Sequence, residues 1–344
     1  MNPIQLNDVR CDVPDVKKHH AFRLLPDGDL SLSIDNSTLE RFQTCPKSAE
    51  FYVIDRRQRP SSAAMSYGSA IHKGMELFYL YGFSDAVWER VMDVVTKHFY
   101  AAPVAMGEWR TLEQCLETLR RYRVEYADKE IIQVMEHNGA PFVEQSFNLP
   151  LGTIPVDAMV PYPLRLLTGE GDAIVPFHVR NIHVNWTGRI DIAAHFPCDD
   201  RPWVVDHKTT SIKGDQFYKQ FELSQQTIGY CWALRELLGQ VPAGLMLNVI
   251  VGRQPTRTGT AVEFDRQRFF YSVEQLEEWH EDILLQCADF CAHMLRGAFP
   301  RSRVWCMGKY GQCPYFDVCS IPSGQRADVL ASSSYVNVDW DPEK

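Results

Sequence analysis

Two aspartates and a lysine lie in one segment of alternating apolar and polar residues, WTGRIDIAAHFPCDDRPWVVDHKTT, at positions 186–210. The alternation predicts a β-hairpin, because successive side chains of a strand point to opposite faces. Asp206 and Lys208 then share one face of the returning strand. A turn centred on residues 198–199 would place Asp191 opposite Asp206, so that two carboxylates and one ammonium group converge.

The charges of this group predict its chemistry. Two carboxylates so close cannot both stay ionised without compensation, which a divalent cation supplies. Hard oxygen ligands suit Mg²⁺ or Mn²⁺. A metal beside a lysine meets the needs of phosphodiester hydrolysis, because the metal stabilises charge on the phosphate while Lys208 positions water or helps to deprotonate it. An ordinary surface Asp–Lys pair explains D-x-K equally well, so the wider sequence has to decide.

That wider sequence holds four short motifs, which follow one another as G-x-x-x-H (Gly68, His72), G-x-x-D (Gly188, Asp191), D-x-K (Asp206, Lys208) and Q-x-x-x-Y (Gln226, Tyr230). In this order they resemble the PD-(D/E)XK nuclease superfamily, specifically its RecB-like branch. That branch includes the CRISPR-associated RecB-like exonucleases, the nuclease domain of AddB and phage-encoded exonucleases. The resemblance implies that His72, Asp191 and Asp206 ligate the metal, together with the backbone carbonyl of His207.

The same resemblance assigns the remaining roles. Lys208 would be the catalytic lysine, while Gln226 and Tyr230 would orient the site or the DNA. Two glutamates are weaker candidates. Glu76 lies four residues after His72 on the same helical face and could support it, and Glu144 ranks below Glu76.

Three cysteines, Cys306, Cys313 and Cys319, lie close together near the C-terminus among Gly, Pro and aromatic residues. Segments of this composition form no regular element of their own and are usually ordered by a metal. Three thiolates need a fourth ligand, for which Cys45 is the candidate. The RecB-like resemblance implies a structural 4Fe–4S cluster on these four, although six residues separate the first two C-terminal cysteines where a C-x-x-C pair is common. Tetrahedral zinc on the same thiolates is the alternative.

The chain has ten cysteines, and its N-terminus lacks the apolar core of a signal peptide. We therefore expect a cytoplasmic protein of a bacterial, archaeal or phage-infected cell, with thiols rather than disulfides. No apolar run is long enough to span a membrane. The six other cysteines are best explained as small core residues: Cys11, Cys115, Cys198, Cys231, Cys287 and Cys291.

Hydrophobic periodicity predicts a mainly helical first 140 residues followed by strands and helices. The expected helices lie at about 66–81, 84–100, 109–137, 214–238 and 272–296, and the expected strands near 141–151, 172–179, 182–195, 202–209, 244–252 and 260–271. This order predicts an α/β (α+β) fold. The resemblance implies a restriction-endonuclease-like central mixed sheet flanked by helices, with a helical insertion and an Fe–S staple.

We expect one RecB-like nuclease domain over residues 34–320. It would comprise a helical part at about 34–140, a nuclease core at about 141–300 and an Fe–S loop at 301–320 joined to Cys45. Residues 1–33 would be an irregular lead-in, and residues 321–344 a loosely ordered tail.

The 344 residues carry 35 Lys and Arg against 44 Asp and Glu, a formal charge of −9, which excludes a uniformly basic coat for nucleic acid but not a local basic groove. Basic residues cluster at Arg56-Arg57-Gln58-Arg59, Arg120-Arg121-Tyr122-Arg123, Lys213 with Lys219, and Arg301 with Arg303. Each is by default a solvated face, and some could line a DNA channel.

These observations lead to a metal-dependent DNA exonuclease acting on single strands or duplex ends. The implied setting is DNA repair and recombination, phage DNA processing or CRISPR adaptation. No ATP-binding P-loop motif is present, so unwinding would need a helicase or another recombination or CRISPR partner; an oligomer is possible. The alternative is a nuclease-like DNA-binding or assembly subunit with little activity of its own. A zinc-stapled hydrolase of unrelated substrate is a weaker third hypothesis.

Overall fold

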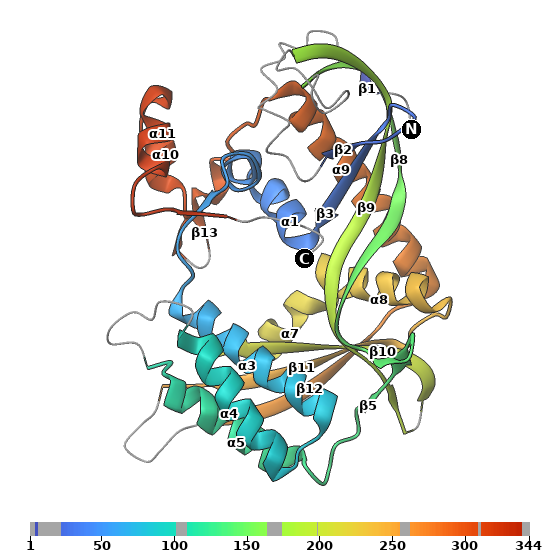
Figure 1. Ribbon diagram of the computed structural model, residues 1–344, viewed down its shortest axis with the longest axis vertical. Helices are drawn as coiled ribbons and strands as arrows, with labels where there is room; N and C mark the ends of the chain where they lie inside the picture. The colour runs from blue at the N-terminus through green and yellow to red at the C-terminus, as the bar shows by residue number, and fades with distance from the viewer. Residues whose placement is uncertain are drawn as a thin grey trace. The chain divides into compact units, whose positions relative to one another are not determined.

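The computed structural model (Figure 1) describes residues 4–5, 22–100, 109–163, 174–197, 199–254, 262–308 and 311–338. The chain divides into two compact units, each assembled from separate stretches of sequence. One unit comprises Met1–Pro60, Ser146–Gly188 and His280–Lys344, and the other comprises Ser61–Gln145 and Arg189–Trp279. Among the described residues, no helix has both the length and the apolar character needed to cross a membrane.

Mixed strand directions characterise the sheet, in which β1, β8, β9, β10, β11 and β12 are neighbours in that order. In the second unit, β10 (Asp199–Thr210) is antiparallel to the end of β9 (Ile174–Phe196) and parallel to β11 (Gly244–Gly252). β12 (Val262–Phe270) is antiparallel to β11, and β5 (Gln133–Val134) is antiparallel to β9. The connection between the parallel strands β10 and β11 has to cross over the sheet, and it contains α7 (Asp215–Glu222) and α8 (Gln225–Leu238).

Helices cover both faces of this part of the sheet (Figure 1). α3 (Ala63–Tyr81), α4 (Asp85–Tyr100) and α5 (Leu112–Tyr126) pack together on one face, and α8 packs on β10 and β11 from the other. Alternate strand residues such as Val205 and Met246 join Ile71 and Phe78 of α3 in one buried cluster. The alternation arises because neighbouring side chains of a strand point to opposite faces. The expected α/β fold with a central mixed sheet flanked by helices is confirmed.

Two expected helices end earlier than their apolar patterns suggest. The helix expected at 109–137 ends at Tyr126, and Glu130 then accepts the backbone amides of Ile131 and Ile132 before β5 begins. The helix expected at 214–238 is two helices, because the Ser224 side chain accepts the Gln226 amide and starts α8 anew. Local side-chain hydrogen bonds of this kind compete with helix continuation.

The first unit contains the other part of the sheet. β3 (Leu30–Asp35) is parallel to the start of β9 and antiparallel to β2 (Phe22–Leu24), and β1 (Ile4–Gln5) is parallel to β8 (Val143–Pro163). Within the expected irregular lead-in, residues 1–33, the described part therefore holds β1, β2 and the start of β3, with a turn at residues 25–29. After β3 come α1 (Asn36–Thr44), α2 (Pro46–Ala49) and a π-helical turn (Glu50–Ile54). The long helix α9 is Val273–Arg296.

A small aromatic core organises the C-terminal segment of the first unit. Phe51, Tyr315, Val318, Leu330 and Tyr335 are buried together. The short elements around them are β4 (Arg57–Gln58), β13 (Met307–Gly308), β14 (Gly311–Gln312), α10 (Phe316–Ser320), α11 (Arg326–Leu330) and β15 (Val336–Asn337), with β15 paired to β4. Leu330 and Tyr335, from the segment 321–344 expected to be a loosely ordered tail, belong to this core. In the second unit, two further short strands, β6 (Glu136–His137) and β7 (Ala140–Pro141), pair with each other.

Candidate active site

The register of β9 and β10 brings the two aspartates side by side. Val205 pairs with Ile192, so the next position pairs Asp206 with Asp191, as the hairpin pattern predicts. The backbone amide of His207 donates a hydrogen bond of 2.8 Å to Oδ2 of Asp191. Both carboxylates are buried, Asp206 at 2% and Asp191 at 9% exposure. Burial and the charge of Asp206, opposed by His72, raise the pKa of Asp191.

Lys208 lies beside Asp206 on the same face of β10. Its Nζ is 2.9 Å from Oδ1 and 2.7 Å from Oδ2 of that carboxylate. Burial alone would lower the pKa of Lys208, but the carboxylates of Asp206 and Asp191 outweigh it and raise that pKa. The ammonium group is therefore charged at neutral pH and held at the carboxylates.

His72 reaches the same carboxylates from α3. Its Nδ1 lies 3.5 Å from Oδ2 of Asp191. Gly68, one turn earlier, allows this approach, because a Cβ at that position would lie 2.9 Å from Oγ1 of Thr209 on β10. The G-x-x-x-H spacing thus has a steric meaning: the glycine lets the helix come close to the strand, and the histidine projects from the next turn.

Glu144 joins this group, although the sequence argument ranked it last. One ligand atom each of His72, Glu144 and Asp191 lies within 4.8 Å of the others. Glu144 has a positive φ of 51°, an unusual conformation for a glutamate that turns its side chain away from the regular pleat. Burial, then the charge of Asp191, raises the pKa of Glu144 to about 7. No sequence signal reports a positive φ at a glutamate, so this residue could be ranked only from the structure.

Glu76 makes a different contact from the one expected. Its carboxylate pairs with Lys73 at 2.6 Å, one turn away on α3, and it is not in the group that His72 forms with Glu144 and Asp191. Glu76 is therefore paired with Lys73, and its charge also helps to raise the pKa of Glu144.

The donor set fits a divalent cation. Both oxygens of Asp206 face the Lys208 ammonium, and the Asp191 carboxylate beside it adds a second negative charge. Two buried carboxylates that share one ammonium group are costly, and a divalent cation would compensate them. The carboxylates of Asp191, Asp206 and Glu144 and the imidazole of His72 are hard or borderline ligands of the kind that bind Mg²⁺ or Mn²⁺.

α8 adds the Q-x-x-x-Y pair to the same region. Nε2 of Gln226 donates to the Tyr230 hydroxyl at 3.0 Å, across one turn of the helix. Burial and the negative charges of Asp206 and Asp191 raise the pKa of Tyr230. The hydroxyl is thus a neutral hydrogen-bonding group close to the carboxylates.

The family follows from one comparison. A model of the PD-(D/E)XK nuclease superfamily matches residues 33–320. The chain belongs to this superfamily. Its nucleases use divalent metals, in agreement with the donor set above. No curated protein matches the chain. One solved structure with detectable similarity is described as “Putative exonuclease” from Eubacterium rectale. That protein is 13% identical over 84% of this chain and 87% of its own, with a TM-score of 0.41.

The cysteines expected to bind a cluster all lie in the first unit. Cys45, Cys306, Cys313 and Cys319 are free thiols. Within the described ranges, no three of their sulfurs come within 4.8 Å of one another. Burial raises the pKa of Cys313, and Cys45 and Cys306 raise it further, which puts the three thiols in one neighbourhood.

Four of the cysteines expected in the core are there: Cys115, Cys231, Cys287 and Cys291 are fully buried. Cys11 and Cys198 lie outside the described residues.

Acidic neighbours balance most of the basic clusters of this nuclease. Glu117 pairs with Arg120 and Arg121, and Asp85 pairs with Arg123. Lys213 lies 3.3 Å from Glu263, and Arg59 contacts Asp317. These exposed pairs contribute little to stability, and they leave less unbalanced positive charge for DNA than the sequence suggests.

Proposed function

We propose that this nuclease is a metal-dependent DNA exonuclease that uses Mg²⁺ or Mn²⁺. The observation that carries the proposal is the buried pair Asp191 and Asp206 on neighbouring strands, with the Lys208 ammonium on the same carboxylates. A surface Asp–Lys pair would be solvated, whereas these two carboxylates are withdrawn from water and share one ammonium group. Burying these charges lowers the stability of the fold. An arrangement that destabilises the protein is better explained by catalysis than by a structural role.

Each side chain then has a chemical role. His72, Asp191, Asp206 and the backbone carbonyl of His207 would hold the cation, and Glu144 lies close enough to add a carboxylate. A divalent cation bound there would stabilise negative charge on the scissile phosphate and acidify water. Lys208 would orient that water and the phosphate through its ammonium protons. Gln226 and Tyr230 would orient the site or the DNA strand.

A 4Fe–4S cluster on Cys45, Cys306, Cys313 and Cys319 is the second part of the proposal. The supporting observation is that the pKa of Cys313 is raised by burial and also by Cys45 and Cys306, so these three thiols lie in one neighbourhood. The cluster would act as a structural staple, and tetrahedral zinc on the same thiolates is the alternative.

We expect DNA with free ends as substrate, single-stranded or duplex, and a helicase or another recombination or CRISPR protein as partner. DNA repair and recombination, phage DNA processing and CRISPR adaptation all require such end processing. A cytoplasmic location follows from these roles.

The test uses full-length protein purified anaerobically, incubated with Mn²⁺ and end-labelled linear DNA, beside a closed circle of the same sequence. An exonuclease degrades the linear molecule and leaves the circle intact, and the label reports polarity. Asp206→Ala should abolish cleavage. Cleavage that survives Asp206→Ala contradicts the assigned site, and cleavage of the circle contradicts exonuclease action. DNA binding without any cleavage by the wild-type protein would favour the alternative of an assembly subunit.

A further inference from the structure

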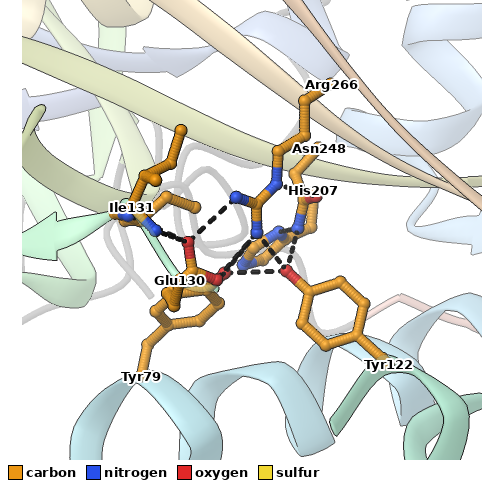
Figure 2. A network of polar contacts seen from close by, with 8 residues as sticks. Tyr79, Tyr122, Glu130, Ile131, His207, Asn248 and Arg266 are labelled. Carbon is orange, nitrogen blue, oxygen red and sulfur yellow. Dashed lines mark hydrogen bonds and ion pairs between the residues drawn. The ribbon is translucent and has the colours of Figure 1, made fainter. Parts of the chain in front are cut away.

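A buried polar network (Figure 2) includes His207, the residue between Asp206 and Lys208 on β10. At its centre, Arg266 of β12 and Glu130 form a two-point ion pair, with Nη1 to Oε1 at 2.9 Å and Nη2 to Oε2 at 2.7 Å. The Tyr79 hydroxyl donates to Oε2 of Glu130 at 2.8 Å and lies 2.7 Å from the Tyr122 hydroxyl. Figure 2 shows both tyrosines reaching from their helices toward the sheet residues.

Both oxygens of the Glu130 carboxylate accept hydrogen bonds. Oε1 accepts the amides of Ile131 and Ile132 as well as Arg266, and Oε2 accepts Arg266 and Tyr79. The Arg266 and Glu130 side chains are only 13% and 12% exposed. Buried ion pairs add little net stability over apolar packing, but a saturated one admits a single geometry. The network is therefore better suited to fixing positions than to strengthening the fold.

The network reaches the catalytic strand through a ladder of three side chains on neighbouring strands. His207, Asn248 and Arg266 occupy paired positions of β10, β11 and β12. Nε of Arg266 donates to Oδ1 of Asn248 at 3.2 Å, and Nδ2 of Asn248 donates to Nδ1 of His207 at 2.9 Å. The ring of His207 is thus held from the face of β10 opposite to Asp206 and Lys208.

The same network reaches the other ligand-bearing elements. Tyr79 stacks on the His207 ring at 5.5 Å and lies two turns after His72 on α3. Glu130 lies three residues before β5, which pairs with β9 three residues beyond Asp191. The network therefore joins α3, which supplies His72, to β10, which supplies Asp206 and Lys208. It is connected to β9, which supplies Asp191, through β5.

We propose that Arg266, Glu130, Tyr79, Tyr122 and Asn248 are positioning residues that hold the His207 segment of β10 in register with α3 and thereby set the geometry of the cation site. The proposal rests on the proposed function for its catalytic consequence. None of these residues contacts the candidate ligands through its charged or hydroxyl group, so their effect passes through His207 and the backbone.

The test compares Asn248→Ala and Tyr122→Phe with the matched control Tyr67→Phe. Tyr67 is also a buried tyrosine, and its hydroxyl contacts Thr118 at 2.8 Å and the Gln114 carbonyl at 3.4 Å, both on α5 and neither in the network of His207. Four quantities are measured on each full-length protein: the melting temperature, the affinity for Mn²⁺ by calorimetry, the rate of cleavage of end-labelled linear DNA, and amide hydrogen exchange at residues 206–208.

Asn248→Ala should weaken Mn²⁺ binding and cleavage by roughly ten-fold, the effect typical of groups that orient metal ligands, and should speed exchange at residues 206–208. Tyr122→Phe should change Mn²⁺ binding, cleavage and exchange in the same directions by smaller factors. If Asn248→Ala does not fold, Tyr122→Phe alone tests the positioning role. Tyr67→Phe should lower only the melting temperature.

Equal losses of melting temperature in all three variants, with Mn²⁺ affinity and exchange unchanged, overturn the positioning role. If the wild-type protein neither binds Mn²⁺ nor cuts DNA, the proposed function fails. The positioning role is then tested by hydrogen exchange at residues 206–208 alone. Faster exchange in Asn248→Ala or Tyr122→Phe than in Tyr67→Phe supports it, and equal rates refute it.

Discussion

The backbone amide of His207 donates a 2.8 Å hydrogen bond to the carboxylate of Asp191. The strand that carries Asp206 and Lys208 thus orients the carboxylate of the neighbouring strand through its own backbone. The G-x-x-D and D-x-K motifs are therefore one structural unit, because any shift of β10 against β9 would break this bond and separate the two aspartates.

Lys208→Ala should remove most of the activity while leaving the protein folded. The ammonium group is the only cation on the Asp206 carboxylate among the described contacts, and loss of such a group typically lowers kcat by about 10²- to 10⁴-fold. Initial rates with Mn²⁺ and end-labelled DNA measure this. Lys97→Ala, which removes an exposed Lys–Asp pair on α4, is the control and should leave the rate unchanged. A Lys208→Ala protein with near wild-type kcat would remove lysine from the mechanism.

Glu144→Gln should stabilise the metal-free protein, and more so as the pH rises. Burial raises the pKa of Glu144 from 4.5 to about 7. Between these values the unfolded chain releases a proton that the folded chain keeps, so stability falls as the pH rises through this window, by at most about 3 kcal/mol. Glutamine has no such proton. Denaturant titrations in EDTA at pH 5 and pH 7.5 should give a larger advantage of Glu144→Gln at pH 7.5; an advantage independent of pH contradicts the raised pKa.

Gly68→Ala should impair the site although alanine favours helices. An alanine in place of a helical glycine usually stabilises by about 0.5–1 kcal/mol, but here its Cβ would meet Oγ1 of Thr209 at 2.9 Å. We expect weaker Mn²⁺ binding and no gain in melting temperature. The double variant Gly68→Ala with Thr209→Ala removes the clash. It should restore Mn²⁺ binding and show the gain in melting temperature that alanine normally gives in a helix. If the double variant is no better than Gly68→Ala, the close approach of α3 to β10 does not limit the site.

Cys313→Ser should lose most of the bound iron and sulfide and the visible absorption of a cluster. Cys313 is half-buried beside the aromatic core of Phe51 and Tyr315, so its loss should also lower the melting temperature. Cys287→Ala is the control, because Cys287 is fully buried in α9 and is not among the proposed ligands. Iron and sulfide quantitation after anaerobic purification measures the outcome. Stoichiometric zinc without iron in the wild-type protein would contradict the cluster.

Short-range patterns were enough to predict the hairpin. The alternation of residues 186–210 places Asp191 and Asp206 on one face, because a strand has a side-chain period of two. The structure pairs them as expected, but only after an irregularity between Asp199 and Trp203 that the alternation does not predict. The spacing of Gly68 and His72 and of Gln226 and Tyr230 likewise follows from one helical turn. These relations are local, so the amino-acid sequence alone determines them.

The tertiary structure decided what depends on contacts between distant segments. Glu144 is the weakest candidate from the sequence, and only a positive φ and the approach of α3 bring it to His72 and Asp191. Nothing in the sequence singles out Arg266 and Glu130, because a buried ion pair and a solvated one have the same residue types. Whether a charge is buried depends on which helices and strands pack against it, and 136 residues separate these two partners along the chain.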